Sequence, residues 1–150
     1  MKIDTTIDGK TISITLTEDQ LKEIERQRNP YKKPSDINNY EDACKVLGIM
    51  PPTYDHNLKP IDRIQLIIKA ANFLDNDGKV WREDWDNPSQ YKYYPVFDRR
   101  AGGWVVHCDC CYCLALGGFV PYFKEKETCL FITNKFLDLW LEYMHEGEVI

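Results

Sequence analysis

The period at which apolar residues recur changes along this chain of 150 residues, and that change most constrains its fold. Residues 60–74 carry apolar side chains at helical spacing, in a stripe formed by Ile61, Ile64, Ile68 and Ala71. From Tyr91 the sequence becomes rich in β-branched and aromatic residues, with turn signals at 99–103 and at Gly117-Gly118. We therefore expect an α+β protein in which an antiparallel β-meander over residues 91–123 packs against two longer helices.

The first 30 residues have a pattern of their own. Residues 2–16 alternate between apolar and polar side chains, and Asp8-Gly9 between the two runs predicts a hairpin. Thr17 and Gln20 have the spacing of a capping box, which predicts that a short helix follows. We expect residues 1–30 to form a ββα appendage, which is too small and too one-sided to be stable alone.

Residues 31–39 hold Pro34, two lysines and several polar residues, and we interpret them as a linker. The core domain is then expected over residues 40–150. It begins with a short helix from Tyr40 to Leu47, which Gly48 ends. The longer helix at 60–74 ends near Asp75-Asn76-Asp77-Gly78, which we interpret as an Asp-Gly turn.

The last predicted helix runs from about Glu125 to His145 and carries two apolar stripes instead of one. Two stripes make a wide apolar face, and two arrangements would bury it. The helix packs deeply against its own core, or it is shared with a second copy in a homodimer.

Composition excludes several classes of partner. The net charge is −5, from 19 basic and 24 acidic residues, which argues against broad binding to double-stranded DNA. Residues 1–30 lack the apolar core of a signal peptide, and no window approaches the ~18 apolar residues of a membrane helix. We therefore expect a cytoplasmic protein without a membrane partner, whose six cysteines are reduced.

Four of the six cysteines fall in the segment from His107 to Cys113, at Cys108, Cys110, Cys111 and Cys113. Two overlapping C-x-x-C spacings could supply thiolates to zinc, but a structural zinc site needs a second ligand pair, which the sequence does not provide. The strand-like flanks favour a β-strand, in which Cys108 and Cys111 point to opposite faces. A zinc-binding or thiol-dependent protein using this cluster is the alternative reading.

Binding residues are predicted from exposed-looking aromatic and basic side chains. Trp81 and Trp85 lie among acids in a predicted loop, where they form a surface for a partner or fold over the core. Tyr93, Arg99 and Arg100 complete the candidate set. Aromatic stacking with single-stranded nucleic acid is a weaker alternative, because the acidic net charge opposes it. No phosphate loop, nucleophile elbow or zinc-protease motif is present, so we name no catalytic residue and no cofactor.

Residues 40–145 resemble a group of uncharacterised small proteins from Bacteroidetes genomes, their phages and integrated elements. The group's motifs are an "F-E-D-A-C" helix start, "W-x-P-D-W-x-N" followed by "K-Y-Y-P-x-F", an aromatic strand, "G-S-R-L-C-F-K" and "K-Q-F-x-D-L-Y". Their counterparts here are Tyr40–Cys44, Trp85–Asn87, Lys92–Phe97, Gly103–Trp104, Gly118–Lys124 and Lys135–Trp140. Phe119–Tyr122 replaces the group's "S-R-L-C", and the cysteine run is not part of its pattern.

The resemblance implies a phage or mobile-element origin and carries no activity with it. Together with the absent catalytic motifs, it leads us to expect a non-enzymatic accessory or interaction protein. Its partner would be a host or phage macromolecule, most simply a protein.

Overall fold

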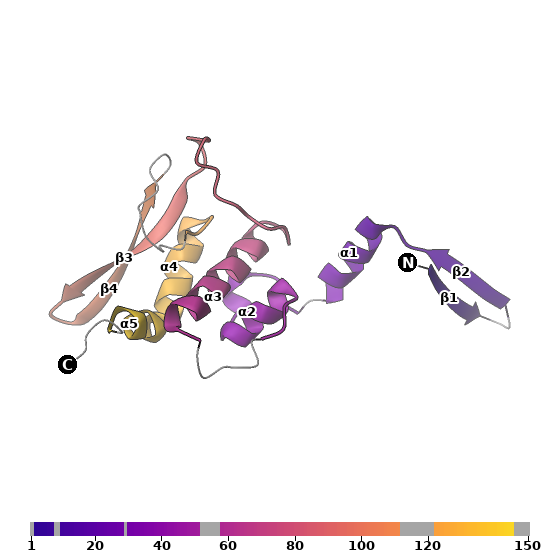
Figure 1. The fold of residues 1–150 in the computed structure, drawn as a ribbon, viewed down its shortest axis with the longest axis horizontal. Coiled ribbons are helices and arrows are strands. Elements are labelled where there is room, and N and C mark those ends of the chain that lie inside the picture. The colour runs from indigo at the N-terminus through magenta and orange to yellow at the C-terminus, as the bar shows by residue number, and fades with distance from the viewer. Residues whose placement is uncertain (1, 8–9, 29, 52–57, 112–121, 146–150) are drawn as a thin grey trace. The chain divides into compact units, whose positions relative to one another are not determined.

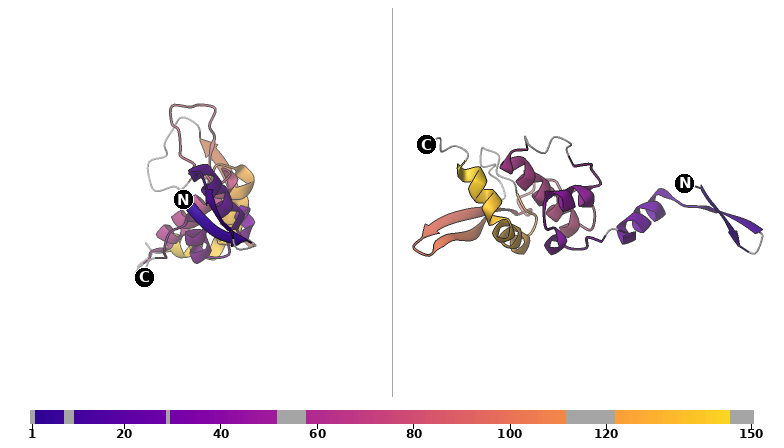
Figure 2. Two further views of the ribbon diagram at one scale, coloured as in Figure 1. Left: turned by 90° about the vertical axis from the view of Figure 1, so that its right-hand side faces the viewer. Right: turned by 90° about the horizontal axis from the view of Figure 1, so that it is seen from below.

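The computed structural model describes residues 2–7, 10–28, 30–51, 58–111 and 122–145. The chain forms two compact units, Met1–Pro30 and Tyr31–Ile150. Each unit is described by itself below, and Figures 1 and 2 show the elements of both. No helix in the described part of the chain is both long enough and apolar enough to span a bilayer.

The first unit contains a β-hairpin followed by a helix. Strand β1 (Lys2–Ile7) pairs antiparallel with β2 (Lys10–Thr15), and the pair Ile7↔Lys10 leaves two residues for the turn. Those turn residues, the predicted Asp8-Gly9, lie outside the described residues. Helix α1 (Glu18–Arg28) begins with the predicted capping box: the Thr17 N–H donates to Gln20 Oε1 at 3.0 Å, and the Gln20 N–H donates to Thr17 Oγ1 at 3.2 Å.

The second unit is an α+β fold, as predicted, and it begins at Tyr31. The linker prediction for residues 31–39 is therefore wrong. The segment contains the 3₁₀ helix η1 (Pro34–Asp36), and the following Ile37 is fully buried in the core. Lys135 also donates to the carbonyl of Ser35 and to Asn38 Oδ1, which ties the segment to the last part of the chain. The composition of 31–39 is mostly polar, and a single apolar residue, Ile37, places the segment in the core.

Helices α2 (Tyr40–Leu47) and α3 (Pro60–Asp75) form as predicted. Asn39 caps α2 by accepting from the Asp42 N–H at 2.7 Å, and Gly48 follows α2 in the left-handed conformation. Helix α3 starts with Pro60, which has no N–H to leave unpaired in the first turn. In Figure 1, α3 lies between α2 and α4 and forms the centre of this unit.

Strands β3 (Lys92–Arg100) and β4 (Gly103–Cys111) form an antiparallel hairpin whose register runs from Lys92↔Cys111 to Arg100↔Gly103. The expected third strand at 119–123 falls mostly outside the described residues. Its last residue, Phe123, exchanges two backbone hydrogen bonds with Tyr93, at 3.0 and 2.7 Å. Because the N–H and C=O of Tyr93 face away from β4, Phe123 lies on the opposite edge of β3. A simple meander would place it beside β4.

The predicted single helix over 125–145 is two helices, α4 (Lys126–Lys135) and α5 (Leu137–His145), separated at Phe136. Phe136 has φ −112° and ψ 30°, outside the helical region. The break divides the apolar residues of 125–145 between α4 and α5, which contact different elements. Helix α4 packs against the hairpin and α3, whereas α5 packs against α3 and brings Trp140 to 5.3 Å from the Phe97 ring.

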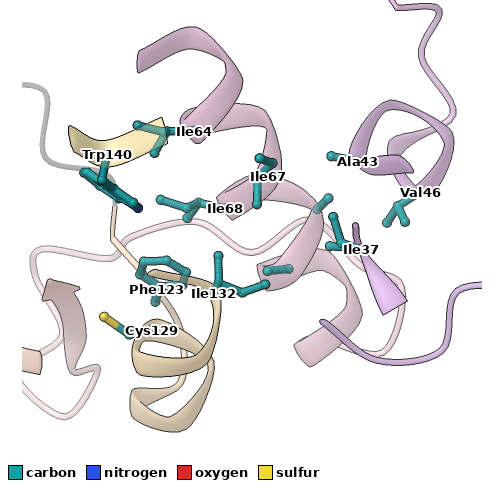
Figure 3. Close-up of a cluster of buried hydrophobic side chains, with 12 residues drawn as sticks. Ile37, Ala43, Val46, Ile64, Ile67, Ile68, Phe123, Cys129, Ile132 and Trp140 are labelled. Carbon is teal, nitrogen blue, oxygen red and sulfur yellow. The ribbon is translucent and has the colours of Figure 1, made fainter. Parts of the chain in front are cut away.

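The core of the second unit lies around α3, between α2, α4, α5 and the β3–β4 hairpin, and Figure 3 shows its buried side chains. Three isoleucines of α3 point into it, together with side chains from α4, α5 and the segment before α4. Its labelled members in Figure 3 are Ile37, Ala43, Val46, Ile64, Ile67, Ile68, Phe123, Cys129, Ile132 and Trp140. Ile68 of this core also lines a surface groove, together with neighbouring residues of α3.

Candidate binding groove

The first wall of this groove comes from the end of α2. The Gly48 N–H donates to the Lys45 carbonyl and the Ile49 N–H donates to the Cys44 carbonyl, at 3.2 and 3.0 Å. These two bonds form a Schellman motif, which requires the left-handed Gly48 at φ 66°. The motif turns the chain and sets Ile49 beside α3, where 44% of its surface remains exposed.

The second wall comes from the loop that follows α3. Asp77 (φ 54°) and Gly78 (φ 73°) are both left-handed, and the Gly78 N–H donates to the Phe73 carbonyl at 2.9 Å. The predicted Asp-Gly turn at the helix end is confirmed. It reverses the chain, so that Val80 to Glu83 return along the outer side of α3. Val80 keeps 69% of its surface exposed.

The groove between these walls has a volume of about 670 Å³. Its floor is the outer face of α3, from Gln65 to Phe73, together with Tyr122. The lining is mainly apolar, and the charged side chains stand at the exposed rim. The apolar and aromatic members are Leu47, Ile49, Leu66, Ile68, Phe73, Val80, Trp81 and Tyr122. Ligand sites in proteins have volumes of about 300–1,000 Å³ and this same kind of lining.

Side-chain hydrogen bonds close the loop between α3 and β3. Gln90 accepts from the Asp84 N–H at 2.6 Å and donates to the Arg82 carbonyl at 3.1 Å. Lys92 is fully buried and donates from Nζ to the carbonyls of Asp84 and Gln90, at 2.5 and 2.9 Å. These bonds give the loop a fixed conformation, because ammonium–carbonyl bonds in a buried site are stronger than neutral ones.

The two tryptophans of this loop have different surroundings. Trp85 packs edge-on against Tyr122, with ring centroids 5.3 Å apart, and the Lys92 ammonium lies 4.8 Å from its ring centroid. Trp85 therefore lies behind the groove wall and supports Tyr122. Trp81 lines the groove itself. Of the two expected roles, folding over the core describes Trp85, and facing the groove describes Trp81.

Asn72 is buried and joins the groove floor to the chain before α4. Its Nδ2 donates to the Tyr122 carbonyl, and its Oδ1 accepts from the Lys124 N–H, both at 2.9 Å. Both polar atoms of the amide are thus satisfied by backbone groups from 50 and 52 residues further along the chain. The clamp fixes Tyr122 between Trp85 and the groove.

The other predicted binding residues lie outside the groove. Tyr93 packs against the core and stacks on Tyr91, with centroids 6.3 Å apart, and burial raises the pKa of its phenol. Arg99 and Arg100 lie at the tip of the β3–β4 hairpin. Arg99 stands over Trp104, and Arg100 donates to Asp98 Oδ2 at 2.8 Å. The structure brings Trp81, and none of the other four, to the groove.

The cysteine-rich segment is β-strand as far as Cys111, as predicted, while Tyr112 and Cys113 lie outside the described residues. Cys108 packs against the core beside Cys129, whereas the Cys111 thiol donates to the Lys92 carbonyl at 3.7 Å. The two thiols of this C-x-x-C spacing thus have separate neighbours. No group of three or more metal-ligating side chains comes together in the described part of the chain.

Burial also sets the chemistry of these thiols. Desolvation raises the pKa values of Cys44, Cys108, Cys111 and Cys129 above the ordinary value of a thiol. A thiol with a raised pKa stays protonated at neutral pH and is a poor nucleophile. His107, which neighbours Cys108 in sequence, is exposed and lies 3.5 Å from Arg100 on the hairpin surface. The surroundings of the four thiols are those of packing residues.

Most of the groove residues were not expected from the sequence. Leu66 and Phe73 lie seven positions apart on α3, off the main apolar stripe, and this helical spacing of two further apolar residues was the available signal. Ile49 and Val80 had no such signal, because single apolar residues in loops are common. Their significance depends on the turns that bring them to the same helix.

Comparison with known proteins identifies no relative of this chain. No protein-family model, no curated protein and no solved structure matches the chain. Function is therefore inferred from the groove and its surroundings.

Proposed function

We propose that this chain is a non-enzymatic interaction protein that binds a host or phage protein through the groove on the outer face of α3. The observation that carries the proposal is the apolar groove of about 670 Å³ with exposed Ile49 and Val80 on its opposite walls. Exposing large aliphatic side chains around a concavity is unfavourable in water, and such patches mark sites of interaction.

The distribution of charge supports binding over catalysis. The charged side chains of the groove, Lys69, Arg82 and Glu83, are all exposed at its rim. General acid–base or nucleophilic chemistry needs a positioned pair of groups in a shielded cleft. A shielded apolar floor with charges only at the rim is the arrangement of an interface, which has an apolar centre and a polar border.

The ordering of the loop supports the same proposal. Gln90 and Lys92 hold the loop that carries Val80 and Trp81, and Trp85 and Asn72 hold Tyr122 beneath it. A preformed site loses less conformational entropy when a partner binds. The resemblance to phage and mobile-element proteins adds the setting, in which small accessory proteins act on components of the host or of the phage.

A matched pair of valines provides the experiment. Val80 lies on the groove wall, and Val96 is an exposed valine of β3 that does not line it. Partners are captured from a lysate of a Bacteroidetes host with the tagged wild-type chain, Val80→Asp and Val96→Asp, and quantified by mass spectrometry. The proposal expects a protein retained by the wild type and Val96→Asp but lost by Val80→Asp. If every captured protein is retained equally by all three, the groove is not the binding site.

A further inference from the structure

We infer that the groove accepts one face of an amphipathic α-helix that carries acidic residues beside its apolar anchors. The inference rests on the proposed function and names the chemical class of the partner segment. It is drawn from three properties of the groove: its length, the chemistry of its lining and the charge of its rim.

The length of the groove matches a short helical ligand. The floor extends from Gln65 to Phe73 along α3, eight residues apart, which at 1.5 Å per residue is about 12 Å. Anchors at positions i, i+3 or i+4, and i+7 of a ligand helix span about 10 Å. Three anchor side chains of two helical turns therefore fit along this floor.

The lining also separates the three common ways of binding a peptide. Addition of a β-strand needs a free sheet edge, and no residue of β3 or β4 lines the groove. Proline-rich segments dock on ridges of exposed aromatic rings. Here the exposed wall residues are mostly aliphatic, Ile49 and Val80, and Tyr122 is buried in the floor. Aliphatic walls around a helical floor suit the apolar face of a helix.

The rim gives the charge of the ligand. Among the described residues of the rim, Lys69 and Arg82 stand with one acid, Glu83, so cations outnumber acids there in a chain whose net charge is −5. Acidic side chains that flank the anchors of a ligand helix would meet these two cations. Complementary charge of this kind adds specificity and speeds association more than it adds affinity.

The test uses peptides displayed on phage, selected against the whole 150-residue chain. Peptides of about 16 residues are long enough to form a helix in the complex. Enriched sequences are synthesised, and their affinities are measured for the wild type, Val80→Asp, Ile49→Asp, Arg82→Glu and the control Val96→Asp. Thermal melting of each variant checks that it is folded.

The inference expects enriched sequences with apolar residues at i, i+3 or i+4, and i+7, and with Asp or Glu between them. Binding should weaken about tenfold or more in Val80→Asp and Ile49→Asp, as at the centre of an interface. It should weaken about two- to fivefold in Arg82→Glu, as for an exposed ion pair. Val96→Asp should bind as the wild type does.

Other outcomes overturn the inference separately from the proposed function. Proline-rich or strictly alternating peptides whose binding depends on Val80 would exclude the helix but keep the groove as a binding site. Enrichment of Lys and Arg in helical peptides would exclude the acidic ligand. If no peptide depends on Val80 while a host protein still does, the helix inference fails alone. If neither depends on Val80, both proposals fail.

Discussion

Replacing Asn72 by aspartate exchanges the NH2 of the side-chain amide for an oxygen and leaves the size of the side chain almost unchanged. The Oδ1 that accepts from the Lys124 N–H is kept, but the Nδ2 that donates to the Tyr122 carbonyl becomes a carboxylate oxygen facing that carbonyl. At neutral pH the buried site then contains a charge, a Tyr122 carbonyl that has lost the Asn72 donor, and a repulsion between two oxygens. A protonated aspartic acid can donate to the carbonyl and so restores the original pattern.

The expected loss follows from these contacts. An orphaned buried hydrogen-bonding group costs about 1–3 kcal/mol, and a desolvated charge beside it adds to that cost. We expect Asn72→Asp to lower the free energy of unfolding by about 3 kcal/mol at pH 7, a large share of the 5–15 kcal/mol of a typical domain. Burial raises the pKa of the introduced carboxyl, so stability is retained at low pH and lost as the pH rises through that pKa.

Urea denaturation between pH 4 and pH 8, followed by circular dichroism, measures this effect. The control is Asn134→Asp on α4, where the side chain is exposed and Nδ2 donates to the Leu130 carbonyl at 2.8 Å. Asn134→Asp should lower the free energy of unfolding by about 1 kcal/mol or less, with little dependence on pH. A free energy of unfolding of Asn72→Asp within about 0.5 kcal/mol of the wild type at pH 7, the usual range of surface substitutions, would refute the clamp.

Three further substitutions test other contacts. Burial is the main cause that raises the pKa of Asp75, with Glu125 and Glu127 adding to it. Its contribution to stability is therefore present below its ordinary value of 3.8 and is lost as the pH rises. We expect Asp75→Asn to raise the melting temperature by a few degrees at pH 7. Near pH 3.8 its melting temperature should equal that of the wild type, and equal melting temperatures at both pH values would contradict this expectation. The Tyr31 hydroxyl donates to Asp42 at 2.7 Å and is the main cause that lowers the pKa of that carboxyl. Tyr31→Phe should therefore lower the melting temperature at pH 7, and the difference should vanish as acid protonates Asp42, whereas a constant difference would assign the effect to packing. Gly48→Ala should lower the free energy of unfolding by about 1–2 kcal/mol, because φ is 66° and a Cβ strains the left-handed backbone. No atom lies within 4 Å of the added Cβ, so no clash adds to this cost; an unchanged midpoint of chemical denaturation would show that the strain is absent.

Local signals in the sequence predicted the elements that depend on local chemistry. The capping box at Thr17, the stop at Gly48 and the turn at Asp77-Gly78 each act within a few residues, and each forms as expected. Helix α3 was predicted from one apolar stripe, and the β3–β4 hairpin from its change of period. These predictions succeeded because the spacing of apolar residues reports directly which face is buried.

The failures concern contacts between distant parts of the chain. Ile37 made an apparent linker part of the core, because one buried apolar residue outweighs a polar neighbourhood. The predicted helix over 125–145 is divided at Phe136, so that α4 packs on the hairpin and α3 whereas α5 packs on α3. The pairing of Phe123 with Tyr93 joins residues far apart in sequence, and no local pattern indicates it.

The groove was predictable only in part. Trp81 was a candidate from its loop and its neighbours, but Ile49, Leu66 and Val80 meet only after two left-handed turns and a helix have formed. Lys92 lies in the predicted β-rich run, and its buried ammonium holds the loop through two carbonyls. Such a role depends on what lies above the strand, which its own sequence does not contain.

Site-specific photo-crosslinking inside host cells tests the central claim most directly. A benzophenone amino acid is placed at Val80 on the groove wall or, as the control, at Val96 on β3. Binding at the groove predicts a discrete crosslinked partner from position 80, absent from position 96 and suppressed when Ile49→Asp is added. Equal crosslinking from both positions, or crosslinking from position 96 alone, would contradict the account.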